Sequence, residues 1–252
     1  MQSKWFVIPK HNPQADIRLI CFPYAGGSSS IYTSWVNSLP ENVELIIMQA
    51  PGRSNRMFET PIDKMDILAD NLLAEIPTLL NKPYVLFGHS LGSRVCFELI
   101  LRLNKLGLQL PLHFIASGSS GPQKERHNIS YNLPESEFIS KLRTMNGTPE
   151  ELLKNKELMS LLLPMLRADF EIAETFQYTG NALFNISLSI FGGEDDTDVT
   201  NDDLYLWQQF FKPKAKTTKF PGGHFFINSH KELVLEKVNK VLSMYINKTI
   251  PC

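Results

Sequence analysis

Apolar positions recur along this chain with two different patterns, one typical of strands and one typical of helices. Short apolar or β-branched runs predict strands at 18–22, 43–48, 84–87, 113–116 and 186–191. Longer stretches with apolar residues at helical spacing, such as Val95, Leu99 and Leu103, predict helices at 65–80, 91–106, 204–211 and 233–245. Strands that alternate with helices predict right-handed βαβ units. We therefore expect an α/β fold with a mainly parallel sheet and helices on both faces.

The segment from about 130 to 179 interrupts this alternation. It shows no strand pattern, only short helical patterns, and the run 158–166 is too apolar for a solvated surface helix. An all-helical insertion with surplus apolar residues is typical of a lid over a pocket. A helical subdomain that merely packs on the sheet is the alternative. We expect one domain, 1–252, with this helical lid inserted.

Composition and charge exclude several classes of function. The chain has 252 residues, 43% hydrophobic and 20% charged, and its formal net charge of −1 gives no electrostatic case for nucleic acid. Residues 1–10 lack the apolar core of a secretory signal, and no run reaches the ~18 apolar residues of a membrane span. Cys21, Cys96 and Cys252 are too few and too far apart for a disulfide framework. We expect a soluble, cytoplasmic, monomeric protein without a metal.

The strongest chemical signal is the motif Gly88-His-Ser-Leu-Gly92, directly after a predicted buried strand and before a predicted helix. This is the setting of a nucleophile elbow, in which a sharp turn exposes a serine at its tip. The motif predicts the α/β-hydrolase fold with Ser90 as nucleophile. A purely structural tight turn is the alternative.

A serine nucleophile needs a histidine base. His224 fits best, because two glycines precede it and two phenylalanines follow it in a segment that can carry an imidazole to a pocket rim. The others stand in polar segments, at element starts or inside the elbow: His11, His89, His113, His127 and His230.

The acid of an α/β-hydrolase triad should lie between the serine and the histidine in the chain. The loop after the strand at 186–191 offers four acids, Glu194, Asp195, Asp196 and Asp198, and pattern alone cannot choose among them.

The oxyanion hole should combine two backbone N–H groups. One belongs to Leu91, the residue after the nucleophile. The second should come from the glycine-rich loop 22–27, where Tyr24 is the first choice and Ala25 the second; a plain glycine-rich turn is the alternative.

Several separate segments, in order and nearly from end to end, resemble the type II thioesterases that serve nonribosomal peptide and polyketide synthases. They are the strand and loop 20–27, the Pro-Gly-Arg segment 51–56 with Glu59, the elbow 87–92, the segment 163–169 with Glu174, and the histidine loop 221–225. Ser93 departs from the pattern, which usually has glycine or alanine there. The resemblance implies that Asp196, three residues before Val199, is the catalytic acid, although the extra Asp195 and Asp198 leave Asp195 as an alternative.

The resemblance further implies an activity and a partner. The enzyme would hydrolyse acyl thioesters on the phosphopantetheine arm of acyl- or peptidyl-carrier domains and remove misloaded groups. It would need no cofactor of its own, because the arm belongs to the partner. A medium-chain fatty-acyl thioesterase, a general carboxylesterase and an inactive hydrolase-like binding module are the alternatives.

Carrier domains in such systems are acidic, so basic residues should line the pocket mouth. The candidates are Arg53 and Arg56, and less specifically the lysines at 212, 214, 216 and 219. A buried ion pair with Glu59 is the alternative explanation for the two arginines, and a solvated charged surface for the lysines.

Overall fold

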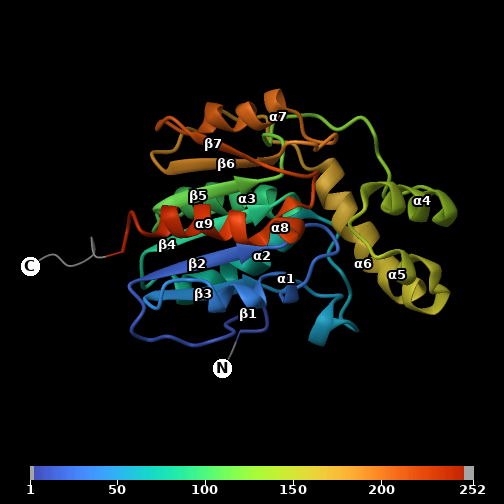
Figure 1. Ribbon diagram of the computed structural model, residues 1–252, viewed down its shortest axis with the longest axis horizontal. Coiled ribbons are helices and arrows are strands. Elements are labelled where there is room, and N and C mark those ends of the chain that lie inside the picture. The colour runs from blue at the N-terminus through green and yellow to red at the C-terminus, as the bar shows by residue number, and fades with distance from the viewer. Residues whose placement is uncertain (1–2, 247–252) are drawn as a thin grey trace, which may run out of the picture.

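The computed structural model describes residues 3–246, which contain one seven-stranded sheet in the order β1-β3-β2-β4-β5-β6-β7 (Figure 1). Strand β1 is antiparallel to β3, and all other neighbours are parallel. The strands are β1 Phe6–Val7, β2 Ile17–Phe22, β3 Val43–Met48, β4 Tyr84–His89, β5 His113–Ser117, β6 Ser187–Gly193 and β7 Lys216–Phe220.

Helices cover both faces of the sheet. In Figure 1, α9 lies in front of the strands, while α2 and α3 lie behind them. The α-helices are α1 Ser30–Thr33, α2 Met65–Glu75, α3 Leu91–Lys105, α4 Glu135–Met145, α5 Glu150–Lys154, α6 Lys156–Thr175, α7 Asn201–Tyr205, α8 Phe226–Ser229 and α9 Lys231–Leu242. Short 3₁₀ turns occupy Ser34–Asn37, Ser54–Arg56, Ile76–Leu79 and Leu206–Phe210.

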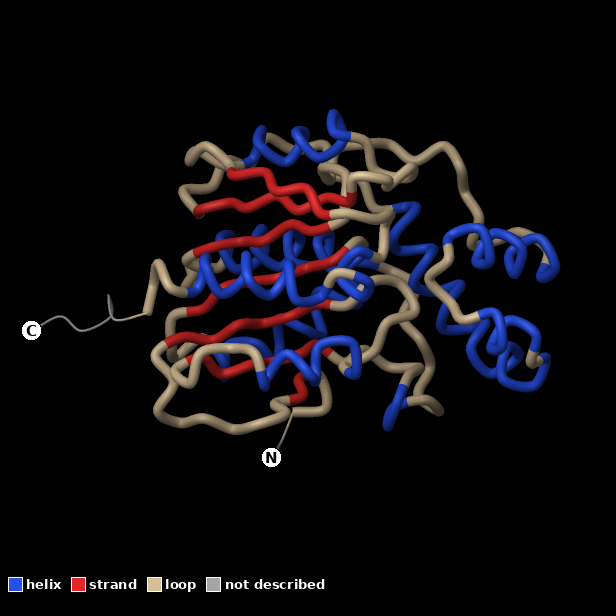
Figure 2. The backbone as a smooth tube through the Cα atoms, in the orientation of Figure 1, coloured by secondary structure: helices blue, strands red, loops and turns tan. Residues whose placement is uncertain are grey.

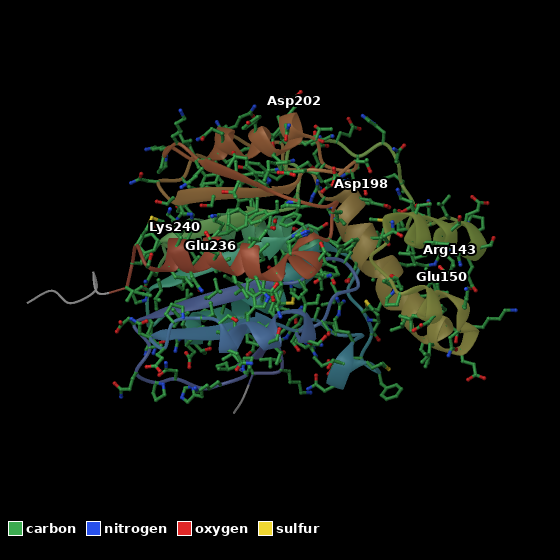
Figure 3. The ribbon with its side chains drawn as sticks, viewed as in Figure 1. Arg143, Glu150, Asp198, Asp202, Glu236 and Lys240 are labelled. Atoms are coloured by element: carbon green, nitrogen blue, oxygen red, sulfur yellow. The ribbon has the colours of Figure 1, made fainter. Side chains whose placement is uncertain are left out.

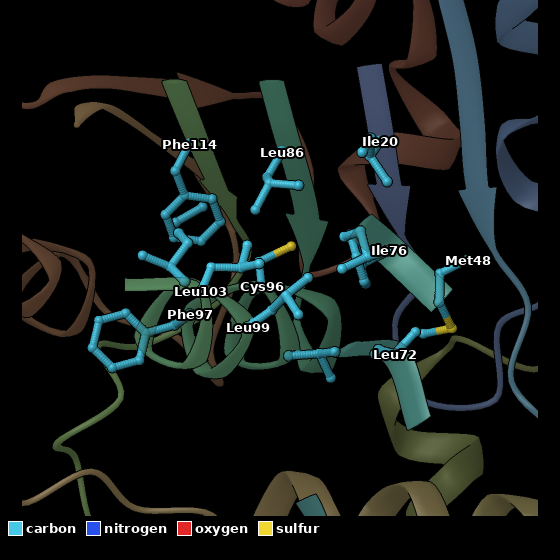
Figure 4. Close-up of a cluster of buried hydrophobic side chains, with 14 of the residues drawn as sticks. Ile20, Met48, Leu72, Ile76, Leu86, Cys96, Phe97, Leu99, Leu103 and Phe114 are labelled. Atoms are coloured by element: carbon cyan, nitrogen blue, oxygen red, sulfur yellow. The ribbon is translucent and has the colours of Figure 1, made fainter. Parts of the chain in front are cut away.

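The central strand β4 shows why both faces must be covered. All six of its residues are buried, and alternate side chains enter different apolar clusters. Leu86 joins the cluster that contains Leu99 and Leu103 of α3 (Figure 4), whereas Phe87 joins the cluster that contains Val234 of α9. The apolar run at 84–87 therefore reflects burial on two sides.

The predicted fold class is confirmed, and all five predicted strands are present with boundary shifts of at most two residues. Two strands were not predicted. Strand β1 has only two residues, and β7 is an edge strand with the sequence Lys-Thr-Thr-Lys-Phe, in which only Phe220 is buried. A strand with one covered residue leaves no apolar pattern to detect.

Between Ser130 and Tyr178 the described chain forms α4, α5 and α6 and no strand (Figure 2). These helices stand beyond one end of the sheet, at the right of Figure 1. They have their own apolar cluster, which includes Phe138, Leu142 and Leu163. Arg143 of α4 pairs with Glu150 of α5 at 2.9 Å on the outer surface of this unit (Figure 3).

Candidate active site

The turn between β4 and α3 holds Ser90 in a strained backbone conformation. Its φ of 53° and ψ of −115° lie in a region that non-glycine residues rarely adopt, at a cost of about 1–3 kcal/mol. A Cβ atom at Gly88 would lie 2.4 Å from the backbone of Gly92, and one at Gly92 would lie 2.0 Å from the carbonyl oxygen of Phe22. Both glycines are therefore required by close backbone approach, as the elbow motif predicts.

Three side chains form a continuous hydrogen-bonded relay. The Nε2 atom of His224 lies 2.9 Å from Ser90 Oγ, and its Nδ1 atom lies 2.8 Å from Asp196 Oδ2. A carboxylate can only accept, so Nδ1 carries the proton and Nε2 presents its lone pair to the serine hydroxyl. The side chain of Asp196 is 1% exposed and that of His224 is 10% exposed. The relay is thus largely shielded from water.

Among the four candidate acids, the structure brings only Asp196 to the imidazole. Its other oxygen, Oδ1, accepts the backbone N–H groups of Asp198 at 2.9 Å and Val199 at 3.1 Å, which fixes the carboxylate. Asp195 is exposed, and only its backbone N–H is bonded, to Gly222 at 3.0 Å. Glu194 is exposed as well. The turn that follows Asp196 therefore selects it over its neighbours.

The glycine-rich loop after β2 forms a tight turn beside Ser90. The Gly27 N–H donates to the Tyr24 carbonyl at 2.8 Å, and Gly26 has a φ of +79°. Within residues 3–246, the N–H groups of Tyr24 and Ala25 have no acceptor. The N–H group of Leu91, the first residue of α3, also has no acceptor within this range. The structure thus keeps both candidates for the second oxyanion donor open.

His89 links the elbow to the histidine loop, a contact that the sequence did not predict. It is fully buried, and its Nε2 lies 2.9 Å from the backbone oxygen of His224 while its Nδ1 lies 2.9 Å from Ser117 Oγ. Because a carbonyl only accepts, Nε2 carries the proton and Nδ1 accepts from the serine. Burial, with a smaller effect of His224, holds the pKa of His89 well below its usual range, so the ring is neutral. The sequence signal was its place inside the elbow.

Ser93, the residue that departs from the expected pattern, links the elbow to β5 through hydrogen bonds. Its hydroxyl donates to the Gly88 carbonyl at 2.7 Å and accepts the Ser117 N–H at 3.1 Å. A glycine or alanine could make neither bond. The substitution therefore adds hydrogen bonds directly behind the nucleophile.

A mainly apolar cavity of about 260 Å³ opens at Ser90 and His224. The helical insertion supplies most of its apolar wall: Leu142, Met145, Leu152, Leu162, Met165, Leu166 and Phe170. Where α4 ends, a Cβ atom at Gly147 would lie 2.2 Å from the ring of Phe225, next to the histidine. The insertion therefore rests on the histidine loop and roofs the reactive serine.

Arg53 and Arg56 require a correction, because neither lies on the surface where an acidic partner could meet it. Each is 6% exposed. Arg53 forms a two-pronged ion pair with Asp169 of α6, with both N–O distances 2.8 Å. Arg56 donates to the Gln49 carbonyl and to Glu59, both at 2.8 Å. The ion-pair explanation with Glu59 thus holds for Arg56, whereas Arg53 has a different partner.

No group of three or more His, Cys, Asp or Glu residues in the described range could hold a metal ion. Cys21 and Cys96 are free and buried, and burial raises the pKa of both thiols. Cys252 lies outside the described residues. Residues 3–246 also contain no helix long and apolar enough to cross a membrane.

Comparison with known proteins agrees with this geometry. The model of the thioesterase domain family matches residues 17–242. The gramicidin S biosynthesis protein GrsT of Aneurinibacillus migulanus is 36% identical over 245 residues, covering 97% of this chain and 96% of that protein. The medium-chain S-acyl fatty acid synthase thioesterase of Anas platyrhynchos is 32% identical, covering 96% and 95%. The solved structure of the type II thioesterase BorB, from the borrelidin biosynthetic cluster, superposes with a TM-score of 0.86 at 29% identity, covering 95% and 98%.

Proposed function

We propose, since this chain belongs to the thioesterase domain family, that it is a serine thioesterase of nonribosomal peptide or polyketide synthesis. It would hydrolyse acyl thioesters on the phosphopantetheine arm of carrier domains and so release misloaded groups. The observation that carries the proposal is the Ser90–His224–Asp196 relay at the mouth of an apolar cavity. The gramicidin S biosynthesis protein GrsT and the type II thioesterase BorB of the borrelidin biosynthetic cluster support the assignment.

Acylation follows from the hydrogen-bond directions of the relay. Ser90 Oγ attacks the thioester carbonyl while His224 Nε2 takes the hydroxyl proton, and Asp196 stabilises the imidazolium that forms. The N–H groups of Leu91 and of Tyr24 or Ala25 would donate to the oxyanion. Collapse of the tetrahedral intermediate breaks the C–S bond, and His224 Nε2 gives its proton to the departing sulfur, so the arm leaves as its thiol and the imidazole is neutral again. With a pKa near ~8.5, this thiol leaves more readily than an alcohol or amine.

Deacylation repeats the sequence with water. His224 Nε2 takes a proton from water, which attacks the acyl-serine carbonyl, and returns a proton to Ser90 as the carboxylic acid departs. No step needs a metal or a cofactor held by this chain. The pantetheine thiol is part of the partner.

The cavity accounts for the acyl half of the substrate. Its apolar wall favours a hydrocarbon chain over a charged group, because each buried CH₂ contributes about 0.8 kcal/mol. The same wall supports the second candidate, a medium-chain fatty-acyl thioesterase like the Anas platyrhynchos relative. Chain-length preference on carrier substrates separates the two.

The roof over the cavity must move to admit the arm, and we propose that α4 and α5 are its moving part. Helix α6 is anchored at two places in its C-terminal half, by Asp169 on Arg53 and by Glu174 on the N–H groups of Ser130 and Tyr131. The outer helices lack such buried ion pairs: the Arg143–Glu150 pair between them is exposed.

One assay panel tests the function. Purified protein is given acetyl-, hexanoyl- and decanoyl-carrier proteins, the matching acyl-CoAs, and a nitrophenyl ester, with the Ser90→Ala variant as control. We expect kcat/KM to be highest on carrier thioesters, with acetyl among the accepted groups. Preference for decanoyl with no acetyl turnover would favour the fatty-acyl enzyme. Turnover of the ester alone would refute the thioesterase proposal.

A further inference from the structure

Helix α6 touches the glycine-rich loop through two residues one turn apart. Asp169 Oδ2 accepts the Gly26 N–H at 2.7 Å. Leu166 packs so closely that a Cβ atom at Gly26 would lie 2.6 Å from its Cδ2 atom. Residues three apart lie on the same face of a helix, so one face of α6 contacts the turn through both Leu166 and Asp169.

The carboxylate of Asp169 is held in turn by Arg53. Asp169 is 4% exposed, and both of its oxygens accept from the guanidinium. Arg53 also donates to the Gly27 carbonyl at 3.0 Å. The ion pair therefore holds the turn through two hydrogen bonds: Asp169 accepts the Gly26 N–H, and Arg53 donates to the Gly27 carbonyl. Because the guanidinium neutralises the carboxylate, the pair adds little net charge beside the site of a developing oxyanion.

The orientation of one peptide group, Ala25–Gly26, decides which type of turn residues 24–27 form. The bond from Gly27 N–H to the Tyr24 carbonyl, with positive φ at Gly26, is the pattern of a type II turn with Gly26 at its third position. Types I and II differ by rotation of the central peptide, here Ala25–Gly26. That rotation would turn the Gly26 N–H away from Asp169. The Tyr24 and Ala25 N–H groups belong to the same turn and would shift with it.

We propose that Asp169 is a positioning residue for the oxyanion hole: through the Gly26 N–H it holds the turn 24–27 in the form that aims an N–H at the substrate oxyanion. The inference rests on the proposed hydrolytic function. It makes the lid helix α6 part of the catalytic scaffold, so that the oxyanion hole is complete only when α6 is seated.

Glu174 provides a matched control on the same helix. It is also an acid that anchors α6, but it accepts the N–H groups of Ser130 and Tyr131 and has no bond to the glycine-rich loop. Loss of either anchor should loosen α6. Only loss of Asp169 should free the turn.

The readout compares two ketones with the same alkyl chain. A trifluoromethyl ketone adds Ser90 Oγ and forms an oxyanion adduct, whereas the methyl ketone binds without one, so the ratio of their inhibition constants reports oxyanion stabilisation. We expect Asp169→Ala to reduce this ratio and kcat about 10- to 100-fold, with KM within about twofold, since losing a whole oxyanion donor costs about 10²- to 10³-fold. Glu174→Ala, which removes the other anchor of α6, should leave the ratio at the wild-type value.

Gly26→Ala disturbs the same turn while keeping the Arg53–Asp169 pair. It should reduce the ratio by a similar factor, and it carries the test if Asp169→Ala does not fold. An unchanged ratio in the folded variants, or an equal loss in Glu174→Ala, would overturn the inference. A wild-type protein that binds the trifluoromethyl ketone yet cleaves no thioester would instead refute the proposed function, and the ratio would still decide the role of Asp169.

Discussion

Replacing His89 with leucine removes the donor that holds the histidine loop in place. Leucine fills nearly the same volume, but it leaves the His224 carbonyl without its Nε2–H partner and Ser117 Oγ without its acceptor. Both groups lie in or beside the buried core. The change should therefore act on stability through the lost bonds and on catalysis through the position of the His224 imidazole.

The two effects have different sizes. An unsatisfied buried polar group costs about 1–3 kcal/mol, and the Ser117 hydroxyl can rotate to another acceptor, so we expect a loss of about 2 kcal/mol in the free energy of unfolding. A shift of about 1 Å in a catalytic group costs about 10²-fold in rate. We therefore expect kcat to fall about 100-fold in His89→Leu, with KM nearly unchanged.

His113 supplies the matched control. It is also a buried histidine on a central strand with both ring nitrogens bonded, to Tyr245 Oη at 3.1 Å and Ser189 Oγ at 2.9 Å, but it begins β5 at the end of the sheet away from Ser90. Urea unfolding and steady-state hydrolysis of an acyl-CoA should show similar stability losses in both leucine variants and a kcat loss only in His89→Leu. Equal kcat in the two variants would refute the positioning role of His89.

Four further expectations follow from the contacts. Asp196→Asn should lower kcat by about 10³-fold or more in single-turnover hydrolysis, while Asp195→Asn stays within about twofold; the reverse order would reassign the acid. Arg56→Gln should lower the free energy of unfolding by about 2–3 kcal/mol and reduce kcat/KM by the same factor on carrier and CoA substrates, and a loss confined to the carrier would restore the docking role. Burial lowers the pKa of His113 to about 4, below the ~6.5 of the unfolded chain, so its neutral form contributes stability that is complete above pH 6.5 and lost toward pH 4. The stability advantage of the wild type over His113→Leu, measured by urea unfolding, should therefore shrink by about 3 kcal/mol over that range, and a constant advantage would contradict the burial effect. In hydrogen exchange, α4 and α5 should open more readily than α6 and β4, and uniform protection would argue against a moving roof.

The elements that the sequence predicted well are those whose side chains are covered on every side. β4 is buried throughout and most of α3 is buried, so both show a clear apolar pattern in the sequence. The elbow between them follows from two glycines that close backbone contacts require. The same local motifs pointed to Ser90 and His224, which the structure brings within 2.9 Å of each other. Such features depend on neighbours in the chain, which a sequence displays.

The features that were missed depend on distant partners. Arg53 and Asp169 are 116 positions apart. The pattern alone left four neighbouring acids open, and the resemblance pointed to Asp196, because the choice depends on how one turn points them. His89 looked like a bystander in its motif because its partner is the backbone of His224, 135 positions later. Hydrogen bonds to a backbone atom leave no trace in the partner's residue type, so pattern reasoning cannot find them.

The positions of the basic candidates for carrier docking also depend on the fold. Ser90 follows the carboxyl end of β4, and β7 runs parallel to the other central strands, so its beginning lies at the opposite end of the sheet. Five residues of strand span about 16 Å, which keeps Lys212, Lys214 and Lys216 away from the pocket mouth although they are exposed. Arg53 and Arg56 are buried in ion pairs, so among these basic candidates Lys219, next to the last residue of β7, remains at the end of the sheet where Ser90 lies. Arg53 instead holds the turn and helix α6 through the Gly27 carbonyl and Asp169, and Arg56 is bound to the Gln49 carbonyl and Glu59, so both arginines act in the scaffold.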